Sequence, residues 1–168
     1  MKSEIIYSGK VVNLRKDEVV LPNGEKSYRE IIEHPGAVVI IAQKCPDTVI
    51  MIKQFRKPIE NILLELPAGT LEPQEKIINC AKRELEEETG YQAQNWEKIY
   101  DFYSAPGFCN EKLSLFFARD LKKTATNTDH DEFIKVKEYN KKNIVTLLNN
   151  NKIRDAKTLI GILWWLNR

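Results

Sequence analysis

Residues 69–91 read GTLEPQEKIINCAKRELEEETGY and contain the strongest helix signal of the chain, over about 73–89. Pro73 suits the first turn of a helix, and Gly90 suits its C-terminal stop. The end of this segment carries four glutamates within five positions: Glu84, Glu86, Glu87 and Glu88. Like charges three or four residues apart on a helix repel each other, so this concentration of carboxylates needs an explanation.

The helical periodicity separates these glutamates. At about 100° per residue, Glu84 and Glu88 fall within about 20° of Ile77, which begins the apolar stripe, whereas Glu87 flanks that row and Glu86 points to solvent. One explanation is a solvated charge run at a frayed helix end, although carboxylates there oppose the helix dipole. The other is an inward pair that holds a hard divalent cation such as Mg²⁺, which prefers oxygen ligands and commonly serves phosphate chemistry.

The composition is that of an ordinary globular protein. A chain of 168 residues with 42% hydrophobic residues can bury one sizeable core, and its net charge of +2 is too balanced to indicate a nucleic-acid or membrane partner. Three scattered cysteines form no metal-binding spacing and make a disulfide framework unexpected. The N-terminal residues have no apolar segment of the signal-peptide kind, so we expect a reduced, cytoplasmic protein.

Strand and turn signals surround the helix. Residues 1 to about 35 read as antiparallel hairpins, with a Pro-Asn-Gly turn at 22–24, and are expected to form an extension before a main domain over 36–168. The main domain begins with buried strands, continues with strands after the helix, and ends with a polar loop at 122–132, a last strand and two helices. This order predicts an α+β protein or an α/β sandwich.

The spacing of the fixed residues in 69–91 is more specific. It reads Gly-x5-Glu-x7-Arg-Glu-U-x-Glu-Glu-x-Gly-U, where U is a bulky apolar residue, and it resembles the Nudix box at every fixed position. Tyr91 is the one soft departure, because an aliphatic residue is usual there. The resemblance implies a Nudix-type α/β/α sandwich, here with an N-terminal antiparallel β extension, and hydrolysis of a nucleoside diphosphate linked to another moiety.

The same resemblance implies roles for the box residues. Glu84 and Glu88 would be metal ligands, and the backbone carbonyl of Ala68 would be a further one. Glu87 would lie close to the metal, and Arg83 would pair with Glu75 or Glu87 and so orient the ligands. The implied cofactor is Mg²⁺, with Mn²⁺ as an alternative.

Motifs outside the box resemble the ADP-ribose pyrophosphatase subgroup of this family. Pro106 lies 16 residues after Gly90 and is by this resemblance a candidate substrate-binding residue. Further likeness is carried by REIIEHPGAVVI at 29–40, QFR at 54–56, ELPAG at 65–69 and IRDAKTLIGILWW at 153–165. The resemblance therefore extends over most of the chain. It implies a homodimer formed by exchange of the N-terminal extension.

Further candidate substrate-binding residues follow from these motifs, and each of these has a purely structural alternative. Arg56 would contact the diphosphate, for which a guanidinium is well suited, or it is an ordinary arginine at a strand end. Arg29 and Glu30 would reach the adenine, in the same or the partner subunit, or they form a cross-strand salt bridge. Glu111 would touch the terminal ribose, or it caps a loop.

The implied reaction is metal-assisted attack of water on one phosphorus of ADP-ribose, which gives AMP and ribose 5-phosphate. In the subgroup that the chain resembles, a loop glutamate beyond the box often completes the site as base or ligand, and the matching loop here is TDHDE at 128–132. Glu132 is the first candidate, followed by Asp131 and His130. Two other functions stay open: a nucleotide-sugar pyrophosphatase, for example for GDP-mannose, and a non-catalytic Nudix-like binding module, which would be expected to have lost box glutamates.

Overall fold

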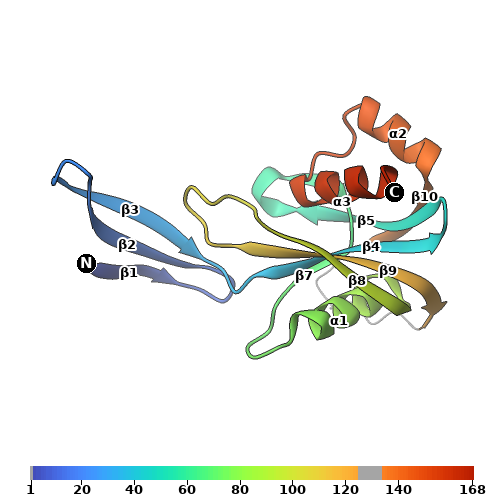
Figure 1. Ribbon diagram of the computed structural model, residues 1–168, viewed down its shortest axis with the longest axis horizontal. Coiled ribbons are helices and arrows are strands. Elements are labelled where there is room, and N and C mark those ends of the chain that lie inside the picture. Colours follow the sequence, from blue (N-terminus) through green and yellow to red (C-terminus); the bar gives the residue numbers. More distant parts are fainter. Residues whose placement is uncertain (1, 125–133) are drawn as a thin grey trace.

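The computed structural model describes residues 2–124 and 134–168. Near the N-terminus, β1 (Ser3–Ser8), β2 (Asn13–Val20) and β3 (Lys26–Glu33) form a three-stranded antiparallel sheet that projects from the rest of the molecule (Figure 1). The turn between β2 and β3 contains the predicted Pro-Asn-Gly, with Gly24 at a φ of 86°. No residue of these three strands is fully buried, so this sheet has no core of its own within the described chain.

The main body is built on a seven-stranded mixed sheet with the strand order β10-β5-β4-β9-β8, to which β6 adds beside β5 and β7 beside β4. Its strands are β4 (Ala37–Cys45), β5 (Thr48–Arg56), β6 (Asn61–Glu65), β7 (Ala68–Thr70), β8 (Tyr91–Tyr103), β9 (Lys112–Lys123) and β10 (Lys135–Asn140). The central strand β4 runs parallel to β9 and antiparallel to β5 and β7. Its first six residues are all buried because both faces of the sheet are covered.

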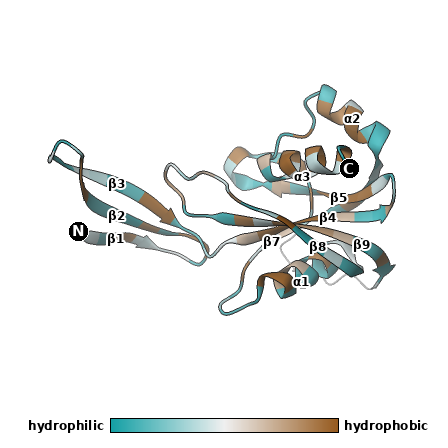
Figure 2. Cartoon of the chain, viewed as in Figure 1, coloured by the Kyte–Doolittle hydropathy of each residue, from teal (hydrophilic) through white to brown (hydrophobic). Residues whose placement is uncertain are grey.

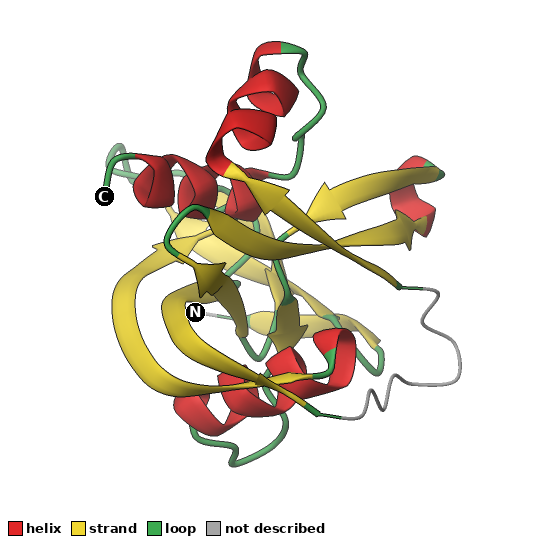
Figure 3. Cartoon of the chain, turned by 90° about the vertical axis from the view of Figure 1, so that its right-hand side faces the viewer, coloured by secondary structure: helices red, strands yellow, loops and turns green. Residues whose placement is uncertain are grey.

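Helices cover the two faces. The helix α1 (Ile77–Thr89) packs on one face, and α2 (Lys141–Asn149) and α3 (Ala156–Leu166) pack on the other (Figures 1 and 3). Alternate residues of β4 serve the two cores: Val38 and Ile40 join the α1 side, whereas Val39 and Ile41 join the α3 side with Trp165. The apolar colouring of the inner elements in Figure 2 follows this arrangement. The α/β/α sandwich predicted from the sequence is confirmed.

The helix with the glutamates begins later than predicted. It starts at Ile77 rather than near Pro73, because Gln74 has a left-handed φ of 66° and the Glu75 N–H closes a turn on the Glu72 carbonyl. Its predicted end is confirmed: Gly90 has a φ of 69° and donates its N–H to the Glu86 carbonyl. Within the described residues, none of the helices is long and apolar enough to cross a bilayer.

Candidate active site

The C-terminal half of α1 presents carboxylates to the short strand β7. Glu88 is 3% exposed, and its Oε2 accepts a hydrogen bond of 3.0 Å from the Ala68 N–H. Glu84 lies against Gly69 so closely that a Cβ on Gly69 would stand 1.8 Å from the Glu84 Cδ. Only glycine leaves room for the carboxylate here. Both glutamates thus point inward, as their helical angles predict.

Arg83 ties the carboxylates of this region together. Its Nε and Nη2 each donate to Glu75 at 3.0 Å, while its Nη1 donates to Glu84 at 2.7 Å and to Glu87 at 3.0 Å. The sequence offered Glu75 or Glu87 as the partner, and the structure shows both. The hydrogen bond from Arg83 is the main reason that the pKa of Glu75 falls to about 2. Glu86 is half-buried, and Gln92 of β8 donates to its carboxylate at 2.8 Å in an exposed hydrogen bond.

The chemistry of these side chains suits a hard divalent cation. The donors are glutamate oxygens, and a single guanidinium is shared among Glu75, Glu84 and Glu87. In the present arrangement Arg83 holds Glu84 and Glu87, and within residues 2–124 and 134–168 no three acidic, histidine or cysteine side chains converge on one point. By ligand type alone, these glutamate oxygens fit a divalent cation.

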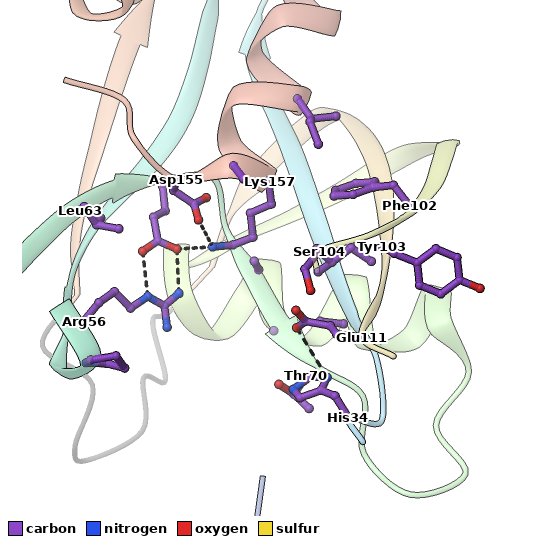
Figure 4. A pocket seen from close by; sticks show the side chains of 18 of the residues that line it. His34, Arg56, Leu63, Thr70, Phe102, Tyr103, Ser104, Glu111, Asp155 and Lys157 are labelled. Atoms are coloured by element: carbon purple, nitrogen blue, oxygen red, sulfur yellow. Dashed lines mark hydrogen bonds and ion pairs between the residues drawn. The ribbon is translucent and has the colours of Figure 1, made fainter. Parts of the chain in front are cut away.

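A cavity of about 540 Å³ adjoins this carboxylate cluster and shares Ala68 and Gly69 with it. Its walls come from the turn after β5, the strands β6 and β7, the segment between β8 and β9, and the start of α3 (Figure 4). The charged and polar side chains that line it are His34, Arg56, Glu65, Thr70, Tyr103, Ser104, Glu111, Asp155 and Lys157. The size is that of a pocket for a small organic molecule.

One wall of the cavity carries two cations on a buried carboxylate. Arg56 binds Glu65 with both Nε and Nη2, at 2.8 and 2.7 Å, and the Nζ of Lys157 donates to Glu65 and, at 3.0 Å, to Asp155 (Figure 4). Burial alone would raise the pKa of Glu65, but the hydrogen bonds from the two cations outweigh it, and the pKa lies below its ordinary value. The pKa of Arg56 is raised, chiefly by its hydrogen bond to Glu65 and also by the nearby charges of Asp155 and Glu88.

The opposite wall presents acceptors. Glu111 stands beside His34, with 3.5 Å between its Oε1 and the histidine Nδ1, and Ser104 lies next to them (Figure 4). The same Nδ1 accepts the Gly36 N–H at 3.1 Å. A carboxylate at this wall can accept hydrogen bonds from hydroxyl groups of a ligand.

The structure divides the predicted substrate-binding residues into two groups. Arg56 and Glu111 line the main cavity together with Ala68. Arg29, Glu30 and Pro106 line a second hollow of about 370 Å³ on the surface of β3, and Tyr103 borders both spaces.

The contacts of Arg56 and Arg29 differ from those that their purely structural alternatives predict. Arg56 is not an ordinary surface arginine, because its guanidinium is held by the buried Glu65. Arg29 stands opposite Asp17 in the strand register, but its Nη1 donates to the Ser27 hydroxyl and the Tyr28 carbonyl instead. The candidate bases Glu132, Asp131 and His130 lie outside the described residues.

Sequence reasoning missed Glu65, Asp155 and Lys157 as members of the site. Glu65 is a lone acidic residue after the apolar run of β6, which is a signal for a buried charge with a partner. Asp155 caps α3 by accepting the Thr158 N–H and hydroxyl, and Lys157 follows in the first turn, where a cation opposes the helix dipole. Such a lysine needs a carboxylate nearby, but its partner lies 92 positions away in the chain.

Comparisons with known proteins indicate the same family as the sequence motif at 69–91. A family model described as NUDIX domain matches residues 33–159. An ADP-ribose pyrophosphatase of Bacillus subtilis is 45% identical, over 95% of this chain and 87% of that protein. A methanol dehydrogenase activator of Bacillus methanolicus is 42% identical, over 96% of this chain and 89% of that protein.

Two further matches are more distant. A GDP-mannose pyrophosphatase of Pectobacterium atrosepticum is 32% identical, over 80% of this chain and 75% of that protein. A solved structure described as an ADP compounds hydrolase superposes with a TM-score of 0.86, over 99% of this chain and 92% of that one, at 21% identity. This last match shows a common fold.

Proposed function

This chain belongs to the NUDIX family, and on that premise we propose that it hydrolyses the diphosphate of ADP-ribose to AMP and ribose 5-phosphate. The observation that carries the proposal is the cavity beside the carboxylate end of α1, with two cations on one wall and Glu111 on the other. Cations suit a diphosphate and a carboxylate suits ribose hydroxyls, so one small pocket offers both parts of such a substrate.

Different residues of the site bind the substrate, hold the metal and accept a proton. Arg56 binds the diphosphate and Glu111 binds the terminal ribose, while Glu84, Glu88 and the Ala68 carbonyl would hold Mg²⁺. When bound, the metal ions lower the pKa of an attacking water and stabilise charge on the diphosphate. Arg83 positions Glu84 and keeps Glu87 at the edge of the site. Glu132 accepts the proton of the attacking water, with Asp131 and His130 as the other candidates.

The second candidate is a GDP-mannose pyrophosphatase, favoured by the match to an enzyme of that name at 32% identity. The higher identity and wider coverage of the ADP-ribose pyrophosphatase relative favour ADP-ribose. A non-catalytic binding module is disfavoured because all the glutamates of the box are present.

A side-by-side assay tests the choice. The purified protein is given ADP-ribose, GDP-mannose or a diadenosine polyphosphate with Mg²⁺, and AMP, GMP and sugar phosphate are quantified. We expect ADP-ribose to be the preferred substrate, turnover to stop in EDTA, and Mg²⁺ or Mn²⁺ to restore it. A clear preference for GDP-mannose would replace the proposed substrate by the second candidate.

We further propose a cytoplasmic homodimer built on the N-terminal sheet. Ile5 and Val20 are 74% and 68% exposed there, and Tyr28 of β3 is also exposed, so the sheet offers apolar surface to a second copy. Arg29 and Glu30 would then reach a partner's substrate. Light scattering at micromolar concentration should give the mass of two chains, and the mass of one chain would contradict the proposal.

A further inference from the structure

The wall of the cavity at Glu65 holds two cations, although the sequence motifs pointed only to Arg56. Glu65 has 1% of its side chain exposed, Lys157 has 15%, and Arg56 has 39%. Arg56 comes from the end of β5 and Lys157 from the first turn of α3, so the buried carboxylate joins two elements that are distant in sequence. Both cations also line the cavity.

Each cation keeps hydrogen-bond donors beyond those given to Glu65. A guanidinium has five N–H donors, and the contacts to Glu65 use the Nε–H and one N–H of Nη2. An ammonium has three, and the Nζ of Lys157 gives one to Glu65 and one to Asp155. The remaining donors are enough to bind oxygen atoms of an anion from two sides.

A purely stabilising role explains this cluster poorly. Taking charges out of water costs free energy, and buried ion pairs can often be replaced by apolar side chains without loss of stability. The junction of β6 with α3 already has another link, because the Leu66 N–H donates to the Thr158 hydroxyl at 2.9 Å. A rigid carboxylate that holds two cations at the rim of a cavity is better explained by what the cations bind.

We propose that Lys157 is a second diphosphate-binding residue and that Glu65 is the positioning residue that presents Arg56 and Lys157 together. The oxygen atoms of a diphosphate would accept hydrogen bonds from the remaining N–H groups of Arg56 on one side of Glu65 and of Lys157 on the other. The inference rests on the proposed function, because it concerns recognition of the same diphosphate. It does not depend on which nucleoside or sugar is attached.

Binding of inorganic pyrophosphate to the full-length protein in EDTA, measured by calorimetry, tests the two roles without catalysis. Lys157→Met should weaken binding by about tenfold or more, the effect of one lost charge-assisted hydrogen bond, while Lys157→Arg should largely restore it. Glu65→Gln is the sharper test. It removes a negative charge, so charge counting predicts tighter anion binding, whereas a positioning role predicts binding weakened several-fold.

The matched control is Lys44→Met, which removes a lysine of another lysine–glutamate pair, formed with Glu138 at the edge of the sheet away from the cavity. It should leave pyrophosphate binding unchanged. Thermal melts establish that each variant is folded, and Lys157→Arg keeps the test informative if Lys157→Met does not fold. With ADP-ribose, Lys157→Met should raise KM more than it lowers kcat.

The outcomes separate this inference from the proposed substrate. Wild-type binding of pyrophosphate by Lys157→Met, tighter binding by Glu65→Gln, or no pyrophosphate binding by the wild type would each overturn the roles proposed for these residues. If the wild type fails to hydrolyse ADP-ribose while pyrophosphate binding still requires Lys157, the proposed substrate is wrong. The diphosphate-binding role of Arg56 and Lys157 is then retained.

Discussion

Replacement of Gly69 by alanine would test how closely the metal-binding function proposed for Glu84 depends on its packing. The added Cβ would lie 1.8 Å from the Cδ of Glu84 and 2.0 and 2.2 Å from its two oxygens, where ordinary contacts begin at 3.4 Å. The Glu84 carboxylate must therefore retreat by more than 1 Å. The φ of Gly69 is not in the left-handed region, so the backbone itself tolerates alanine.

The expected effect is on activity more than on stability. The displaced group is the end of a flexible side chain, so the melting temperature should change little. A catalytic group misplaced by about 1 Å can cost about a hundredfold in rate, so kcat/KM for ADP-ribose with Mg²⁺ should fall by about that factor. The apparent affinity for Mg²⁺, measured by titrating the initial rate, should fall as well.

A double-mutant cycle shows whether the loss acts through Glu84. Glu84→Ala removes the side chain that Gly69→Ala would displace, so the second change should add nothing to the loss caused by the first. Normal kcat/KM in the folded Gly69→Ala variant would refute the reasoning. Independent, additive losses in the double variant would show that Gly69 acts through another contact.

Three further results are expected. Glu88→Gln should reduce kcat by at least about a hundredfold while the protein stays folded, and unchanged turnover would refute a role for Glu88 in metal binding. Because the pKa of Glu75 is lowered to about 2 by Arg83, this pair stabilises the fold above the ordinary glutamate pKa of 4.5, and its contribution is lost as the pH falls toward 2. Urea unfolding of Arg83→Met across this range should show a weaker dependence on pH than the wild type, and equal slopes would count against the pairing. Trp165→Ala removes a side chain that is 1% exposed in the core and should lower the free energy of unfolding by about 3–5 kcal/mol, as measured by urea denaturation; a loss below about 1 kcal/mol would mean that the core repacks.

Local patterns account for the parts of the site that the sequence predicted. The inward direction of Glu84 and Glu88 follows from helical periodicity, which needs no knowledge of the rest of the fold. The start of α1 was predicted too early because Pro73 is compatible with a helix, whereas the left-handed Gln74 depends on how the chain enters from β7.

The cluster of cations in the cavity could not be predicted from local patterns. Arg56 was recognised from its motif, but its partner Glu65 is set by the hairpin of β5 and β6, and Lys157 arrives from the other end of the chain. Such contacts depend on tertiary packing, so no single stretch of sequence contains them. The layered fold was predictable because each apolar run and turn signal was clear on its own.

The parallel pairing of β4 with β9 has a consequence for how the protein folds. Val39 lies beside Leu115, so this contact closes a loop that contains β5, β6, β7, α1 and β8. Closing long loops slows folding, and parallel pairing of distant strands is among the slow steps. During refolding, the helical signal of α1 should therefore recover before enzymatic activity, which has to wait until β9 has joined the sheet.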